Sequence, residues 1–501
     1  MICQKGMAVQ TSASAYQQHS IAAAEGAGDS SEAGRILLRV FEVLDRAGIP
    51  YCVLHGYENY PAHIKSDVDC IIDRNATPRN LVTLLHCNRE TIGAEVVRCQ
   101  GRYIVLAGKS ASGSPCFVTL DLSVDCEVND LPLEDGQVVL SSRRRHRQFW
   151  VPAPDVEFGA YLGRTIAKGS IDGVRGLRLV SLYHQDPAGC DRQAALLWNA
   201  ESRDLIITAV CSGDWDEVNG NRDRLCSELR RRVIALRPLR FVKNMLLALA
   251  ARACRILRPR GVSVVLLGPD GAGKSSVIEA LGPKLEPVMP RNVCWSFAPP
   301  LLSLFRQRKR TTNQPHGLPA RSLPTSLMRL GYWFAYHMLS FVGLRLALAR
   351  STLVLYDRHF VDILVDAKRY RYGGPAWTLH LLWHLIPKPD LVVLLDASPE
   401  VLQARKQEVP FEVTARQCQA YLSLVRTLRN GRIVDANQPK GCVADRVAEL
   451  ILEKLRSDLQ RRFNLQRTHM PPLVLSRSRY PAISTQSAEV ADLKIDSNSA
   501  T

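Results

Sequence analysis

The most informative residues form one loop in the middle of the chain, with the pattern G-x-x-x-x-G-K-[ST]. Glycines let the backbone turn so that its N–H groups surround phosphate oxygens, and a helix that begins there adds positive potential. The lysine of this pattern reaches the β- and γ-phosphates, and the hydroxyl that follows it can bind Mg²⁺. The residues predicted to bind ATP are Gly268, Asp270, Gly271, Ala272, Gly273, Lys274, Ser275 and Ser276.

Two further stretches carry charged residues that suit phosphoryl transfer. Asp357 and Arg358 end an apolar stretch, so we expect the carboxylate to hold Mg²⁺ together with Ser275 while the arginine grips a phosphate. Arg405 lies on a later predicted helix, and we expect it to close over the transferred group and stabilise its charge. The predicted catalytic residues are therefore Lys274, Asp357, Arg358 and Arg405.

A cluster of carboxylates is predicted in the first half of the chain. Asp67 and Asp69 lie two residues apart at the start of a predicted strand, so both side chains point to one side of it. Asp121 on a later strand completes a predicted three-carboxylate metal site, and Asp125 competes with it because both lie on the same strand face. Two metal ions held there would position a triphosphate for nucleotidyl transfer.

Short apolar stretches alternate with helical ones in the half that contains the glycine-rich loop. This alternation indicates an α/β fold, a doubly wound parallel sheet with helices on both faces. The loop follows the first strand and opens a helix, which is the context that its pattern requires. Strands are predicted at 262–267, 293–297, 352–356, 391–395 and 432–436.

Residues 262 to about 455 resemble the thymidylate kinase family of P-loop nucleoside-monophosphate kinases, through "GPDGAGKSS", "YDRHF" and "PDLVVLLDASPEVLQARK". The resemblance implies a sheet with strand order 2-3-1-4-5, and it places Asp270 near the acceptor sugar. It implies that Arg405 acts from a lid, because Ala272 stands where some members have arginine. It also implies ATP and Mg²⁺, with phosphorylation of thymidine monophosphate to the diphosphate as the family default.

The chain departs from that family on the acceptor side. The Arg-Glu-Pro motif of the family is absent, and "CWSFAPP" stands in its place. Arg369 and Arg371 are either ligands of an acceptor phosphate or surface charges. The alternatives to a nucleotide kinase are a kinase for a sugar, lipid or glycan hydroxyl, a nucleotidyltransferase that uses the aspartate cluster, and a nucleotide-binding module without turnover.

The stretch "LHGYENYPAHIKSDVDCII" resembles the nucleotidyltransferase family with the signature hG[GS]…DhDh, and the likeness extends over about residues 36 to 130. It implies an α+β domain in which Asp67, Asp69 and Asp121 bind metal. Tyr57 stands where the family has serine after the glycine. Three readings are open: an active nucleotidyltransferase, a substrate-binding or degenerate relative, and an unrelated fold with a chance Asp-x-Asp.

A chain of 501 residues is long enough for several domains. The apolar stretch from Leu330 to Leu344 is too short to span a membrane and predicts a buried helix. The predicted parts are a disordered segment at 1–34, a nucleotidyltransferase-like domain at 35–150, a helical spacer with a basic segment at 151–260, a thymidylate kinase-like domain at 261–460 and a disordered tail at 461–501.

The charge and the cysteines suggest the kind of partner and the compartment. A net charge of +17 favours acidic partners, here a nucleotide substrate. The basic stretches lack the interspersed aromatic residues that would indicate binding of a nucleic-acid strand. Residues 230–260 contain ten Lys or Arg and no acid; we favour a linker helix there over contact with anionic lipid. The 14 scattered cysteines and the lack of a signal pattern predict reduced thiols and a cytoplasmic protein. A homodimer is left open.

Overall fold

A computed structural model describes residues 31–64, 67–110, 113–129, 131–257, 259–297, 319–407 and 409–465. The disordered segments that we predicted at the two ends lie mostly outside these residues. Both inner boundaries differ from the prediction. The first described helix, α2 (Glu32–Arg46), begins before residue 34 because the Ser31 hydroxyl accepts a hydrogen bond from the Gly34 amide at 3.1 Å. The last helix runs past residue 461 to Phe463, which is buried.

The first part of the chain folds around a mixed five-stranded sheet with the order β1-β2-β5-β4-β3. β2 and β5 are parallel, and the other neighbours are antiparallel. The strands are β1 (Tyr51–Val53), β2 (Val68–Ile72), β3 (Ala94–Gln100), β4 (Tyr103–Lys109) and β5 (Pro115–Ser123), and the helices beside them are α2, α3 (Pro78–Cys87) and α4 (Arg89–Ile92).

Two small hairpins and a helical region follow this sheet. The helices pack on one another around Phe158, Leu179 and Trp198, which are fully buried. Most of the described residues between 154 and 257 are helical. The elements are β6 (Cys126–Val128), β7 (Leu131–Glu134), α5 (Gly136–Ser141), β8 (Arg144–His146), β9 (Phe149–Val151), α6 (Pro154–Lys168), α7 (Gly173–Gln185), α8 (Pro187–Leu197), α9 (Ala200–Ser212), α10 (Asp216–Gly220), α11 (Arg222–Leu236) and α12 (Pro238–Leu257).

The second half contains a parallel five-stranded sheet with helices on both faces. Its order is β11-β12-β10-β13-β14, so the first strand of this half lies in the middle. Alternate residues of β10 enter opposite cores: Val264 and Leu266 face α13 and α19, whereas Val265 and Leu267 face the side of α14 and α16. The strands are β10 (Val262–Leu267), β11 (Arg291–Ser296), β12 (Thr352–Arg358), β13 (Leu391–Asp396) and β14 (Gly431–Asp435). The helices are α13 (Lys274–Leu285), α14 (Leu323–Ala349), α15 (Val361–Val365), α16 (Ala376–Leu385), α17 (Pro399–Arg405), α18 (Phe411–Thr427) and α19 (Lys440–Phe463).

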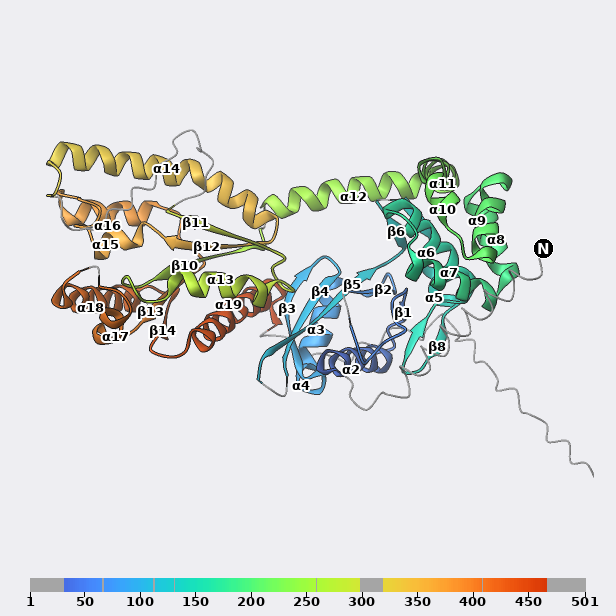
Figure 1. Ribbon diagram of the computed structural model, residues 1–501, viewed down its shortest axis with the longest axis horizontal. Coiled ribbons are helices and arrows are strands. Elements are labelled where there is room, and N and C mark those ends of the chain that lie inside the picture. The colour runs from blue at the N-terminus through green and yellow to red at the C-terminus, as the bar shows by residue number, and fades with distance from the viewer. Residues whose placement is uncertain are drawn as a thin grey trace, which may run out of the picture.

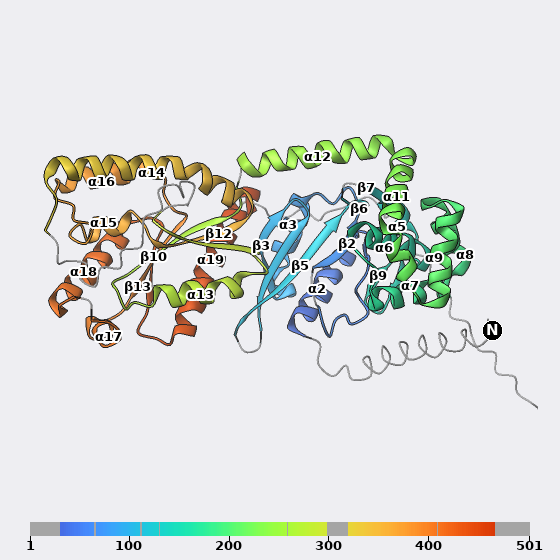
Figure 2. The same cartoon turned by 45° about the horizontal axis from the view of Figure 1, so that its top comes forward.

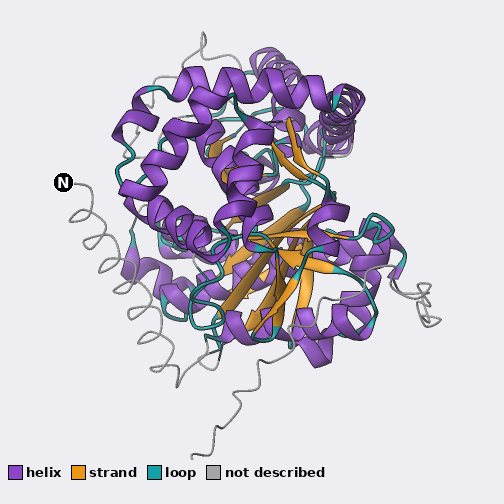
Figure 3. Ribbon diagram, turned by 90° about the vertical axis from the view of Figure 1, so that its right-hand side faces the viewer, coloured by secondary structure: helices purple, strands orange, loops and turns teal. Residues whose placement is uncertain are grey.

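The two halves share an interface at β3 and β4. Helix α19 packs against β3, and Figure 1 shows it between the two sheets. The Arg98 guanidinium on β3 reaches the Val288 carbonyl of the second half, and Arg260 donates to the Cys99 carbonyl at 2.8 Å. Seen along the long axis, the strands lie inside and helices surround them (Figure 3). The parallel sheet of the second half is therefore packed, through α19, against the sheet of the first half.

The apolar stretch at 330–344 is helical, but the prediction that it is buried is wrong for half of its surface. It forms the middle of α14, where Leu330, Trp333 and His337 are buried against the sheet. Leu339 and Val342 lie on the opposite side and are exposed. The helix is apolar all round, whereas the described fold covers only one of its faces.

Candidate active site

Three glycines shape the loop between β10 and α13. Gly268, Gly271 and Gly273 have φ angles of +148°, +88° and +86°, a region that side chains with a Cβ rarely enter. A Cβ on Gly271 would lie 3.0 Å from the Leu402 carbonyl, so this position is also closely packed. No side chain caps the start of α13. The free N–H groups of its first turn and the positive end of the helix therefore suit a phosphate group.

We expect Gly271→Ala to weaken ATP binding about tenfold or more, because the new Cβ strains the backbone by about 1–3 kcal/mol and meets α17. Isothermal titration calorimetry measures this change. Gly441→Ala is the matched control, since a Cβ there meets no atom within 4 Å. Equal ATP affinity in the two variants would show that the loop conformation does not matter for binding.

The Lys274 ammonium lies over this loop. Its Nζ donates to the Gly268 and Pro269 carbonyls at 2.6 and 3.1 Å, and the side chain is buried. Burial and the nearby Arg358 guanidinium lower the pKa of Lys274. The loop therefore holds a buried cation at the point where its glycines leave space for phosphate oxygens.

Asp270 joins the loop to two arginines from distant parts of the chain. Arg358 at the end of β12 donates to its Oδ1 at 2.9 Å, and Arg369 pairs with its other oxygen. Burial lowers the pKa of Arg358, but the neighbouring Tyr370 and Asp270 outweigh it and raise that pKa. Arg371, which the sequence did not separate from Arg369, instead donates to the Pro319 carbonyl at 3.0 Å. The structure thus brings Arg369, and not Arg371, to Asp270.

The residues predicted to hold magnesium, Asp357 and Ser275, lie on β12 and in the first turn of α13. Asp357 follows Tyr356, which is the register partner of Val265 on the neighbouring β10. Ser275 is exposed in the first turn of α13, directly after Lys274. A carboxylate and a hydroxyl are the oxygen donors that Mg²⁺ prefers, so this pair fits the ion chemically. Their role as metal ligands stays a prediction.

Sequence reasoning missed one buried carboxylate in this site. Asp362 accepts hydrogen bonds from the His359 amide at 2.8 Å and from the Tyr421 hydroxyl at 2.9 Å. Burial raises its pKa, whereas Lys274 and Arg358 act to lower it. The sequence signal was an acidic residue inside the apolar stretch "HFVDILV". Burying a carboxylate is costly unless it has hydrogen-bond partners, so an acid at this position indicates that such partners exist. Asp362 therefore fixes the backbone directly after the Asp-Arg pair.

A cluster of aromatic side chains, called the aromatic wall below, lies beside Arg358; it consists of Phe297, Trp333, His337 and Tyr370. The ring of Phe297 lies 6.0, 5.7 and 5.7 Å from those of Trp333, His337 and Tyr370, measured between centroids. Phe297 has a positive φ of +75°, and its amide donates to the Arg358 carbonyl at 2.8 Å. Phe297 belongs to the stretch that the sequence analysis singled out as a departure from the resembled family. The candidate site therefore has aromatic rings beside Arg358.

Arg405 lies at the end of α17, next to Gly271 of the loop. Its guanidinium donates to the Ala436 carbonyl beyond β14 at 3.0 Å, and its side chain is exposed. The structure thus places Arg405 at the loop, but directed toward the end of β14. Its predicted action on the transferred phosphoryl group stays a prediction.

The predicted carboxylates of the first half do lie together. Asp69 and Asp121 are register partners on the parallel strands β2 and β5, and the Tyr103 hydroxyl donates to Asp67 at 3.3 Å. Burial, together with Asp69 and Asp67, raises the pKa of Asp121. However, Arg164 pairs with Asp69 at 3.2 Å. Within the described residues, no group of three or more His, Cys, Asp or Glu side chains is arranged to hold a metal ion. Metal binding by these aspartates stays a prediction.

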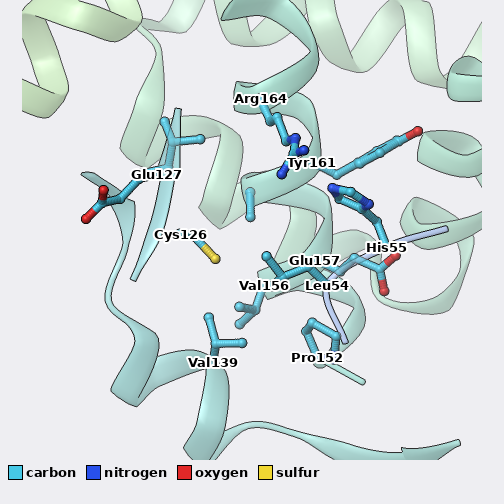
Figure 4. Close-up of a pocket in the computed structure, with 12 residues that line it drawn as sticks. Leu54, His55, Cys126, Glu127, Val139, Pro152, Val156, Glu157, Tyr161 and Arg164 are labelled. Carbon is cyan, nitrogen blue, oxygen red and sulfur yellow. The ribbon is translucent and has the colours of Figure 1, made fainter. Parts of the chain in front are cut away.

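Tyr57 has a structural role in the turn where the nucleotidyltransferase signature has serine. Its hydroxyl donates to Glu157 at 2.7 Å, and the Arg178 guanidinium pairs with the same carboxylate. A cavity beside this network is lined by His55, Tyr161 and Arg164, among other residues (Figure 4). Tyr57 therefore occupies its turn as part of a buried hydrogen-bond network.

Comparisons with known proteins bear on the predicted kinase-like part of the chain. No family model matches this chain. The chain is similar to a thymidylate kinase from Oenococcus oeni, with 27% identity over 218 residues that cover 39% of this chain and 98% of that protein. This likeness supports a kinase-like part in the chain. It gives no support to a nucleotidyltransferase-like part.

Proposed function

We propose that the second half of the chain transfers the γ-phosphoryl group of ATP to a nucleoside monophosphate, with thymidine monophosphate as the first acceptor to test. The observation that carries this proposal is the contact of Asp270 with both Arg358 and Arg369, directly beside the buried Lys274. One anionic side chain thus holds two cations at the edge of a loop that suits the phosphates of a nucleotide.

The chain contributes mainly position and charge to such a reaction. Lys274 and the first amides of α13 would bind the β- and γ-phosphates, and Arg358 and Arg369 would bind the acceptor phosphate. The γ-phosphorus then gains a bond to an acceptor oxygen and loses its bond to the bridging oxygen, which leaves with ADP. Mg²⁺ held by Ser275 and Asp357 would neutralise charge on the phosphates of ATP.

The aromatic wall supports a nucleotide as the acceptor. A nucleobase offers a flat face that stacks on aromatic rings, and Phe297 and Trp333 lie on the side of Arg358. A phosphate on the same molecule would reach the two arginines. A sugar or lipid hydroxyl remains the alternative acceptor, because these aromatic rings would also accommodate a sugar ring or an apolar chain.

The test is a screen of nucleoside monophosphates, sugars and lipid alcohols with γ-labelled ATP. We expect transfer to a nucleoside monophosphate, and we expect Arg369→Ala to lower kcat/KM for that acceptor by about 10- to 100-fold, the value of a charged hydrogen bond. Arg371→Ala is the matched control. Label on a sugar or lipid alone would refute the nucleotide acceptor, and equal losses in the two variants would refute the assignment of Arg369.

A further inference from the structure

Helix α12 is attached to the rest of the protein by Phe241, which packs on the core of the helical region, and by a set of polar contacts. Arg237, just before the helix, donates to Glu134 at 2.8 Å, and Arg240 pairs with Asp135. Asn244 donates to Glu127 at 2.8 Å. At the other end of the helix, the Arg345 guanidinium of α14 donates to the Leu257 carbonyl at 2.9 Å. Arg240 and Asn244, four residues apart, thus lie on the face of α12 that points toward the protein.

The apolar stripe of α12 faces away from these contacts. Leu239, Val242, Leu246 and Leu249 recur at intervals of three or four residues, which places them on one face of a helix. No residue of α12 is buried, and Leu246 and Leu249 are 57% and 51% exposed. A row of exposed large aliphatic side chains of this length is unusual on a protein surface and marks a binding face.

Helix α14 continues the same edge of the molecule. Figures 1 and 2 show α14 and α12 end to end along one side in both views, and the hydrogen bonds of Arg345 join them. The outward side of α14 is also apolar. Its exposed large residues are Leu323, Leu327, Met328, Tyr332, Leu339, Phe341, Val342 and Leu346.

The charges along this edge are of one sign. Neither α12 nor α14 contains Asp or Glu. Lys243 and Arg252 of α12 are exposed beside its apolar stripe, and Arg345 and Arg350 lie at the end of α14. An apolar stripe with flanking cations is the pattern of a helix that lies in the headgroup region of an anionic bilayer.

The sequence alone favours a linker helix over lipid contact at 230–260, but the exposed apolar stripe of α12 changes that preference. We infer that the edge formed by α12 and α14 docks onto the surface of a bilayer that contains anionic phospholipid. The helices would lie in the interface, because none of those in the described ranges is long and apolar enough to cross a membrane. The edge is acid-free along both helices, so a second copy placed against it would bring like charges together. Anionic headgroups carry the opposite charge, so we favour a lipid surface over a second copy of the chain as the binding partner of this edge.

The test is co-flotation of the full chain with vesicles of phosphatidylcholine alone and of phosphatidylcholine with phosphatidylglycerol. We expect binding to the anionic vesicles and a decrease as salt rises. Lys243→Glu with Arg252→Glu should weaken binding by about fivefold for each charge removed. Leu246→Glu with Leu249→Glu should weaken it about tenfold or more. ATP binding by these variants should be unchanged, because none of the four residues lies in the loop site.

Val174→Glu with Leu196→Glu is the matched control, since these residues are 73% and 53% exposed on α7 and α8, away from the edge. Circular dichroism checks that every variant folds. The inference is overturned if the wild type does not float with anionic vesicles, or if the control loses as much binding as the edge variants. It is equally overturned if the wild type is a dimer without lipid and Leu246→Glu with Leu249→Glu makes it a monomer, because the occupant is then a second copy.

Discussion

Lys274→Ala is expected to reduce ATP-dependent phosphoryl transfer by about 10²- to 10³-fold, the usual loss when one preorganised charge is removed from a reacting group. The ammonium is already at the loop, where it donates to the Gly268 carbonyl at 2.6 Å. It is also close enough to Arg358 and Asp362 for their charges to interact: burial and Arg358 lower the pKa of Lys274, and Lys274 opposes the rise that burial causes in the pKa of Asp362. Its loss therefore removes the central cation of the site. Steady-state kinetics with γ-labelled ATP, on the acceptor found by the screen, measures the change.

Lys284→Ala is the control for that experiment. Lys284 lies on the same helix but pairs with Asp445 at its far end. Such a half-exposed pair contributes about 0–1 kcal/mol to stability and nothing to the site. We expect normal turnover in this variant. If Lys274→Ala keeps full turnover, the glycine-rich loop is not the place of the chemistry and the proposed function fails.

The loop and its sheet were predictable because their signals are local. Strands such as Val262–Leu267 are short, apolar on both faces and followed by helix, which only a buried parallel sheet explains. The glycines of the loop indicate where the backbone has positive φ angles, since such positions favour glycine. The order of the strands came from the family resemblance and not from periodicity.

The contacts that complete the site were not predictable, because they join segments far apart in the sequence. Nothing near Arg369 distinguishes it from Arg371, although one reaches Asp270 and the other a backbone carbonyl. The exposure of α14 was missed for a related reason. Its composition indicates burial, whereas the fold supplies a covering layer on one side only. Local composition measures how apolar a segment is, but not what lies over it.

In the first half of the chain, the aspartates of β2 and β5 meet because their strands are neighbours, as the two-residue spacing and the later strand suggested. Tyr57 stands where the nucleotidyltransferase signature has serine. The structure gives this tyrosine a structural role, in a network with Glu157 and Arg178 that ties its turn to α6 and α7. The stability of this half should depend on that network.

Glu157→Ala is expected to lower the free energy of unfolding of the first half by about 3–5 kcal/mol, because it leaves a buried guanidinium without its main partner. The Glu157 side chain is 1% exposed and accepts from the Tyr57 hydroxyl at 2.7 Å and from the Arg178 Nε at 3.0 Å. Glu58 remains near Arg178 at 3.2 Å and recovers part of the loss. Urea denaturation followed by tryptophan fluorescence measures the change, since Trp198 is buried in the same half.

Glu201→Ala is the comparison, because Glu201 pairs with Arg224 at 2.9 Å on the surface, where both side chains are exposed. We expect it to change the unfolding free energy by less than about 1 kcal/mol. Equal losses from Glu157→Ala and Glu201→Ala would show that the buried network carries no special stability. Tyr57 would then need a functional explanation in its turn, and the nucleotidyltransferase reading would regain weight.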